Sequence, residues 1–136
     1  MKSSREQLLS YFKSGEKPGK KLGVEFEHFL IDRESLRSYS YFEKNGQEEI
    51  VNQLINKGWH IDYQENGHIL NASKNNNTLS FEPGGQLELS LKPLENIVEI
   101  QNEYSNIKSE IESILMENQA LISLGSNGNS SILVLG

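Results

Sequence analysis

Residues 78–91 read TLSFEPGGQLELSL, and this stretch decides the fold because polar and hydrophobic residues alternate on both sides of a Pro-Gly-Gly turn. Alternation with a period of two is typical of a β-strand with one buried face and one solvent-facing side. The two halves therefore predict a pair of antiparallel strands. The polar face carries Thr78, Ser80, Glu82, Gln86, Glu88 and Ser90.

The length of the turn follows from the same pattern. A two-residue loop would mix the polar and hydrophobic faces, whereas a three-residue loop over 83–85 keeps each face pure. The alternative is one irregular strand with a bulge at Gly84 and Gly85. In both cases Glu82 and Glu88 share the polar face. The three-residue loop predicts the pairs Glu82 with Gln86, Ser80 with Glu88, and Phe81 with Leu87.

The rest of the chain predicts an α+β fold, in which an antiparallel sheet is flanked by helices. β-forming residues favour strands, and apolar residues spaced three and four apart favour amphipathic helices. Turn residues separate these elements. The predicted elements are a helix ending near Ser14, a strand over 22–31, a helix over 46–57, a hairpin over 59–63 and 68–72, a long helix from Glu95 and a strand over 121–124.

Composition excludes several classes of function. The 136 residues include 13 Lys and Arg against 19 Asp and Glu, so the formal net charge is -6. This balance argues against binding to a nucleic-acid backbone, which needs a basic surface. The chain has no cysteine, so its metal ligands must be oxygen or imidazole. It also has no apolar run of about 20 residues, so we expect no membrane partner and a cytoplasmic location.

Acidic residues concentrate on the predicted sheet. Glu25 and Glu27 share one face of the strand over 22–31, and Glu82 and Glu88 share the polar face of the hairpin. Carboxylates placed this close repel one another unless a cation lies between them. Four of them make a cradle for Mg²⁺, which prefers oxygen ligands. Spacing alone leaves an ordinary amphipathic sheet with one wet side as an equal alternative.

The aromatic and histidine side chains favour structural roles. His28 falls on the face opposite Glu25 and Glu27, which predicts a packed histidine rather than a metal ligand. His60 and His68 belong to the polar hairpin and are predicted at the surface. Trp59 is predicted to anchor the core.

Two motifs carry a resemblance to a known family. Residues 23–27, GVEFE, resemble the G-x-E-x-E of the first strand of glutamate–cysteine ligases. Residues 82–90, EPGGQLELS, followed by Pro93-Leu94-Glu95, resemble the E-P-G-G-Q-x-E-x-S segment of the plant and proteobacterial type of that family. The second motif is long and distinctive. The motifs occur in the family's order, and a long helix follows the second.

The resemblance implies a glutamine-synthetase-like fold, the glutamine synthetase/guanido kinase catalytic type, with its site on the inner face of the sheet. It implies an ATP- and Mg²⁺-dependent ligase that joins the γ-carboxylate of L-glutamate to the amine of L-cysteine through a γ-glutamyl phosphate. This is the first step of glutathione biosynthesis. The implied metal ligands are Glu25, Glu27, Glu82 and Glu88, and Gln86 and Ser90 are implied supporting or substrate-side groups. No residue is assigned as catalytic.

Members of this family are several times longer, and most of their basic residues for nucleotide and substrate lie beyond the matching segment. We therefore expect residues 1–124 to be the N-terminal part of a single ligase catalytic domain and 125–136 to be a flexible or truncated tail. Self-association, or pairing with the missing C-terminal part, is also expected. Two alternatives stay open: a related carboxylate–amine ligase with another amine acceptor, and a non-catalytic sheet module that acts by binding a partner.

Overall fold

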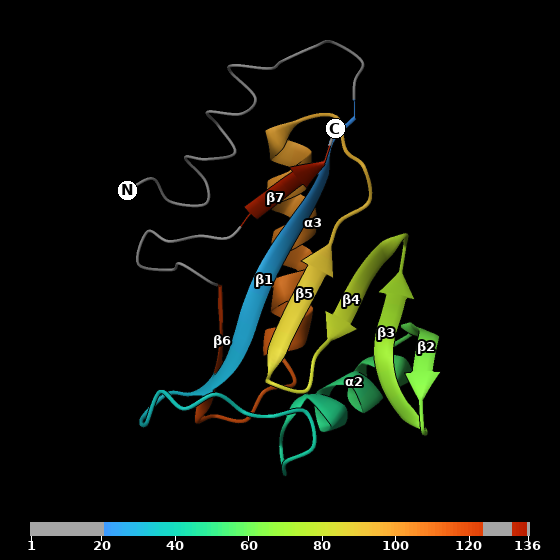
Figure 1. Cartoon of the computed structure of the whole chain (residues 1–136). Helices are drawn as coiled ribbons and strands as arrows, with labels where there is room; N and C mark the ends of the chain where they lie inside the picture. The colour runs from blue at the N-terminus through green and yellow to red at the C-terminus, as the bar shows by residue number, and fades with distance from the viewer. Residues whose placement is uncertain (1–20, 124–131, 136) are drawn as a thin grey trace.

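The computed structural model describes residues 21–123 and 132–135, which form one antiparallel sheet and two helices (Figure 1). The strands follow the order β2-β3-β4-β5-β1-β6, and β7 pairs with β1 beside this path. The α+β class with an antiparallel sheet is confirmed. The elements are β1 Gly23–Asp32, α2 Gln47–Asn56, β2 His60–Glu65, β3 His68–Lys74, β4 Asn77–Phe81, β5 Gln86–Ser90, α3 Ile97–Glu112, β6 Gln119–Ser123 and β7 Ile132–Leu135.

The two helices cover the apolar side of the sheet. Figure 1 shows α3 running behind β1 and β5, and the rings of Phe26 and Tyr104 pack there with their centroids 4.2 Å apart. Residues of α2 join the same hydrophobic core. Along β1, buried and half-buried residues alternate from Gly23 to Leu30. The opposite face of β1 and β5 therefore carries the half-buried polar side chains.

The register of β4 and β5 confirms the three-residue loop. Ser80 pairs with Glu88 and Phe81 with Leu87. The Glu82 N–H then donates to the Gln86 carbonyl at 3.0 Å, one step past the end of the ladder. The alternative, a single bulged strand, is wrong.

The other elements lie close to their predicted bounds. The β2–β3 hairpin turns at Asn66 and Gly67, whose φ values of 52° and 84° fit a tight two-residue turn. Helix α3 begins at Ile97 rather than at Glu95, because the Asn96 side chain caps it by accepting from the Glu99 N–H at 2.9 Å.

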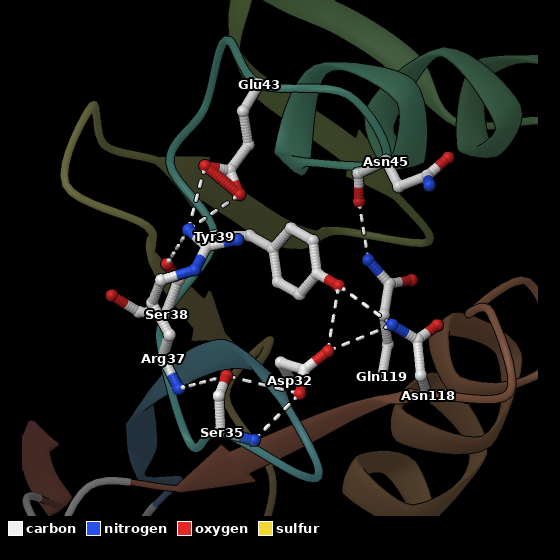
Figure 2. Close-up of polar contacts among 9 residues, drawn as sticks. All are labelled: Asp32, Ser35, Arg37, Ser38, Tyr39, Glu43, Asn45, Asn118 and Gln119. Atoms are coloured by element: carbon white, nitrogen blue, oxygen red, sulfur yellow. Dashed lines mark hydrogen bonds and ion pairs between the residues drawn. The ribbon is translucent and has the colours of Figure 1, made fainter.

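The segment between β1 and α2, for which the sequence predicts no helix or strand, is fixed by a polar network around Asp32 (Figure 2). The Asp32 carboxylate accepts from the Asn118 amide at 3.0 Å and from the Ser35 N–H at 2.9 Å. The Gln119 amide donates to the Asn45 carbonyl at 2.6 Å. The hydrogen bonds to Asp32, led by that of the Ser35 N–H, lower its pKa to about 2. This network ties the segment to the start of β6.

Three predicted segments fall partly or wholly outside the described residues, and one of them is the strand over 121–124, of which the structure describes 121–123. The helix ending near Ser14 lies outside them. Of the predicted tail, the structure describes only 132–135, which form β7 and pair with β1 from Gly23 to Phe26. Neither described helix is long and apolar enough to cross a membrane.

Candidate metal site on the open sheet face

The pairing of β1 with β5 brings the predicted site residues together. Glu27 stands directly opposite Glu88, and Glu25 stands opposite Ser90. Gln86 is two residues before Glu88 on the same strand, so it shares that face. Directly opposed residues of antiparallel strands have Cβ atoms about 5 Å apart. The two motifs therefore meet on the sheet face that α3 leaves open (Figure 1).

Glu82 joins this face from the β4–β5 turn. Its hydrogen bond to the Gln86 carbonyl continues the strand register, which puts it on the same side as Ser80 and Glu88. Its side chain is exposed. We call Glu25, Glu27, Glu82 and Glu88 the acidic face.

Glu88 lies at the centre of the acidic face and responds to its neighbours. Partial burial raises the pKa of Glu88 above the ordinary value, and so do a hydrogen bond with Glu25 and that residue's charge. The charges of Glu27 and Glu82 raise it further. A like-charged pair directly across two strands is destabilising, so this arrangement costs folding energy. A cation would relieve that cost.

The donors fit a hard divalent cation in their chemistry. All four side chains offer carboxylate oxygens, which Mg²⁺ prefers. Within the described ranges, no group of three or more Asp, Glu or His side chains is placed so that it could hold a metal ion by itself. Mg²⁺ is commonly held by one or two carboxylates together with water and substrate phosphates. Glu88, together with Glu25, its hydrogen-bond partner, or with Glu27, the residue opposite it on β1, offers two such ligands.

Sequence reasoning missed the segment that holds the β4–β5 turn. The Tyr41 N–H donates to the Pro83 carbonyl at 3.3 Å. A Cβ at Gly85 would overlap the Tyr39 carbonyl oxygen, and Gly85 has a φ of 95°, so only glycine fits this approach. The Gln47 amide donates to the Gln86 carbonyl at 3.0 Å. The only sequence signal for this contact was the pair of glycines.

The face opposite the carboxylates holds the predicted packed histidine. His28 is 2% exposed, and its Nε2 lies 2.6 Å from the Tyr104 hydroxyl oxygen. Burial, and then the charge of Lys108, lower the pKa of His28 to about 4. His28 is neutral at pH 7 and is separated from the acidic face by the sheet, as its place in β1 predicts.

Comparison with known proteins confirms the resemblance. The chain is 33% identical over 97 residues to glutamate–cysteine ligase B, chloroplastic, of Oryza sativa subsp. japonica, which covers 69% of this chain and 19% of that protein. It is 28% identical over 116 residues to the chloroplastic glutamate–cysteine ligases of Brassica juncea and Arabidopsis thaliana, which covers 84% of this chain and 22% of each relative. The chain thus spans about a fifth of the length of these relatives. No family model matches it.

Proposed function

We propose that this chain is part of the catalytic domain of a glutamate–cysteine ligase and that its acidic face helps to hold Mg²⁺ for ATP-dependent synthesis of γ-glutamylcysteine. The observation that carries this proposal is the register that sets Glu27 opposite Glu88 on the open face, with Glu25 and Glu82 near enough to raise the pKa of Glu88. The names of the curated relatives support the ligase class.

The proposed reaction has two steps. A γ-carboxylate oxygen of L-glutamate attacks the γ-phosphorus of ATP, and ADP leaves. The amine nitrogen of L-cysteine then attacks the γ-glutamyl carbonyl, phosphate leaves, and the amine loses a proton. Phosphoryl transfer depends mainly on positioning and on neutralising charge, so this part of the site needs no protein nucleophile.

The side chains of the acidic face and its polar neighbours would have two roles, metal binding and hydrogen bonding. Bound Mg²⁺ would supply charge neutralisation at the phosphate oxygens. Glu25, Glu27, Glu82 and Glu88 would hold it. Gln86 and Ser90 lie on the same face and offer hydrogen-bonding groups, so we propose that they support the ligands or contact substrate.

We also propose the domain, the ligands and the cellular location that this function implies. Residues 1–124 would form the N-terminal part of one catalytic domain with a glutamine-synthetase-like fold, and the antiparallel sheet with an open polar face supports this. ATP, L-glutamate and L-cysteine would be its ligands. We propose a cytoplasmic location, although the relatives carry chloroplastic names.

The experiment that tests the metal role is a Mg²⁺ titration of the full 136-residue chain by isothermal titration calorimetry. Glu27→Gln and Glu88→Gln should each weaken binding by about tenfold, since each removes a direct ligand. Glu65→Gln is the matched control, because Glu65 is an exposed carboxylate on β2 and makes the same change in net charge. Absence of Mg²⁺ binding by the unmodified chain, or equal losses in all three variants, would refute the metal role.

A second assay measures ADP release with L-glutamate and L-cysteine present. We expect no turnover from this chain alone, because the γ-phosphate and substrate carboxylates need basic partners that the matching segment does not supply. Turnover that Glu27→Gln abolishes would show instead that the chain is complete as an enzyme.

A further inference from the structure

We propose that Gln47 is a positioning residue for the acidic face and holds the β4–β5 turn, which carries Glu82 and leads into β5, where Glu88 lies. The inference rests on the proposed metal role of those carboxylates. Gln47 is the first residue of α2 and is 1% exposed. Its place in the sequence, 35 residues before Glu82, gives no sign of this contact.

The contact is made at the point where the turn joins β5. The Gln86 carbonyl accepts from the Gln47 amide at 3.0 Å and also from the Glu82 N–H at 3.0 Å. One carbonyl oxygen therefore joins the turn to the start of α2. Glu82 lies on one side of this junction, and Glu88 lies two residues beyond it on β5.

The surrounding segment limits the movement of α2 relative to the turn. The Glu48 N–H donates to the Tyr41 carbonyl at 3.0 Å, and Tyr41 itself donates to the Pro83 carbonyl. Gly85 lies directly against the Tyr39 carbonyl. Within this frame, Gln47 is the side chain that reaches the motif backbone.

The unpaired oxygen of the Gln47 side chain also argues against a role in packing alone. Its Oε1 atom is buried and has no hydrogen-bond partner among the described residues. A buried polar atom left unpaired is costly, and an apolar side chain of similar shape would avoid that cost. A position that served packing alone would favour such a side chain. What glutamine adds at this position is the hydrogen bond that its amide donates to the Gln86 carbonyl.

The test compares Gln47→Met with Gln119→Met in the full chain. Gln119 is the control because it is also a buried glutamine, at 2% exposure, whose amide donates to a backbone carbonyl, that of Asn45, away from the β4–β5 turn. Its Oε1 atom also accepts from the Met116 N–H at 2.9 Å, so its loss should cost more global stability than the loss of Gln47. The first readout is amide hydrogen exchange of Glu82 and Gly85, whose N–H groups form the turn's hydrogen bonds. The second is Mg²⁺ affinity by calorimetry.

We expect Gln47→Met to speed exchange of the Glu82 amide by about fivefold, the effect of losing one neutral hydrogen bond. We expect it to weaken Mg²⁺ binding by about tenfold, as is typical when a group that orients metal ligands is removed. Gln119→Met should change neither readout beyond the shift in global stability. Methionine also removes the buried unpaired Oε1 atom, which offsets the lost hydrogen bond, so the unfolding midpoint should stay nearly unchanged and a folding defect cannot mimic the result.

The outcomes test the positioning role of Gln47 and the proposed metal role separately. Unchanged exchange at Glu82 in Gln47→Met overturns the positioning role, and so does an equal effect of Gln119→Met. Faster exchange with unchanged Mg²⁺ affinity also overturns it, because the turn would then not control the ligands. If the unmodified chain does not bind Mg²⁺, the proposed function fails, and the exchange readout alone decides whether Gln47 positions the turn.

Discussion

Acidification should destabilise this chain through one buried histidine. His28 is packed against Tyr104 on the helix side of the sheet, and the rings are stacked with centroids 5.6 Å apart. Burial is the main cause that lowers its pKa from 6.5 to about 4, and the nearby charge of Lys108 adds to it. Tyr104, which is half-buried beside His28, has its pKa raised to about 12, mainly by burial, and stays neutral. Lys108 is therefore the charged neighbour that opposes protonation.

The sign and size of the effect follow from linkage. Between pH 6.5 and pH 4 the unfolded chain binds a proton at His28 that the folded chain does not, so stability falls as pH falls through this window. Above pH 6.5 both states are neutral at His28 and the effect vanishes. The two pKa values differ by about 2.5, and one pKa unit is about 1.4 kcal/mol, so about 3 kcal/mol is lost by pH 4. That is a large part of the roughly 5–15 kcal/mol that stabilises an ordinary domain.

The assay is urea unfolding at several pH values, followed by the fluorescence of Trp59, the chain's one tryptophan. His28→Gln keeps a polar group but cannot titrate, and His60→Gln, at an exposed position on β2, is the control. Asp32 and Glu88 also titrate under acid, but they are present in every variant and cancel in the difference. The free energy of unfolding should fall about 3 kcal/mol more in the unmodified chain than in His28→Gln. Parallel pH profiles for these two proteins would refute the reasoning.

Three further predictions follow from contacts of the turn, the acidic face and the α3 cap. Gly85→Ala should cost more than about 2 kcal/mol in urea unfolding, because of its positive φ and the close Tyr39 carbonyl, while Gly84→Ala, with open space around it, should cost much less; equal costs would contradict this. Glu88→Gln should raise stability at pH 7 without Mg²⁺ by up to about 1 kcal/mol, since its raised pKa means that ionisation opposes folding; a loss measured by thermal melting would argue against carboxylate repulsion. Asn96→Ala should cost about 1 kcal/mol through loss of the α3 cap, and an unchanged midpoint would show that the cap contributes nothing.

The sequence predicted the sheet face well because its signal is local. The alternation around 83–85 specified which residues oppose each other, and the structure has that register. The same period of two predicts that Glu25 and Glu27 lie on one face of the strand and His28 on the other face, and the structure has this arrangement. The long helix was equally clear from its apolar spacing, and only its first residue was misplaced, because the Asn96 cap depends on side-chain geometry.

What the sequence could not supply was the support of the turn. The segment from 32 to 45 has no periodic pattern, so the sequence predicts a loop there. Its order depends on contacts between residues far apart in the chain, such as Asp32 with Asn118 and Gln47 with Gln86. Pattern analysis detects neighbours along one element and does not detect such pairs. The metal role of the carboxylates remains a prediction for the same reason, since spacing reports a shared face but not a ligand.

The two faces of β1 specify its register together. A slip of one residue would turn Glu25 and Glu27 into the hydrophobic core and bring Phe26 and His28 to the open face. Burying two carboxylates without partners is far more costly than their mutual repulsion on a half-exposed face. The repulsion at Glu88 therefore does not threaten this choice of faces, because a one-residue slip would place the carboxylates of Glu25 and Glu27 in a worse environment. A sheet of this kind can hold carboxylates close together without a bound cation, and it can remain ready to bind one.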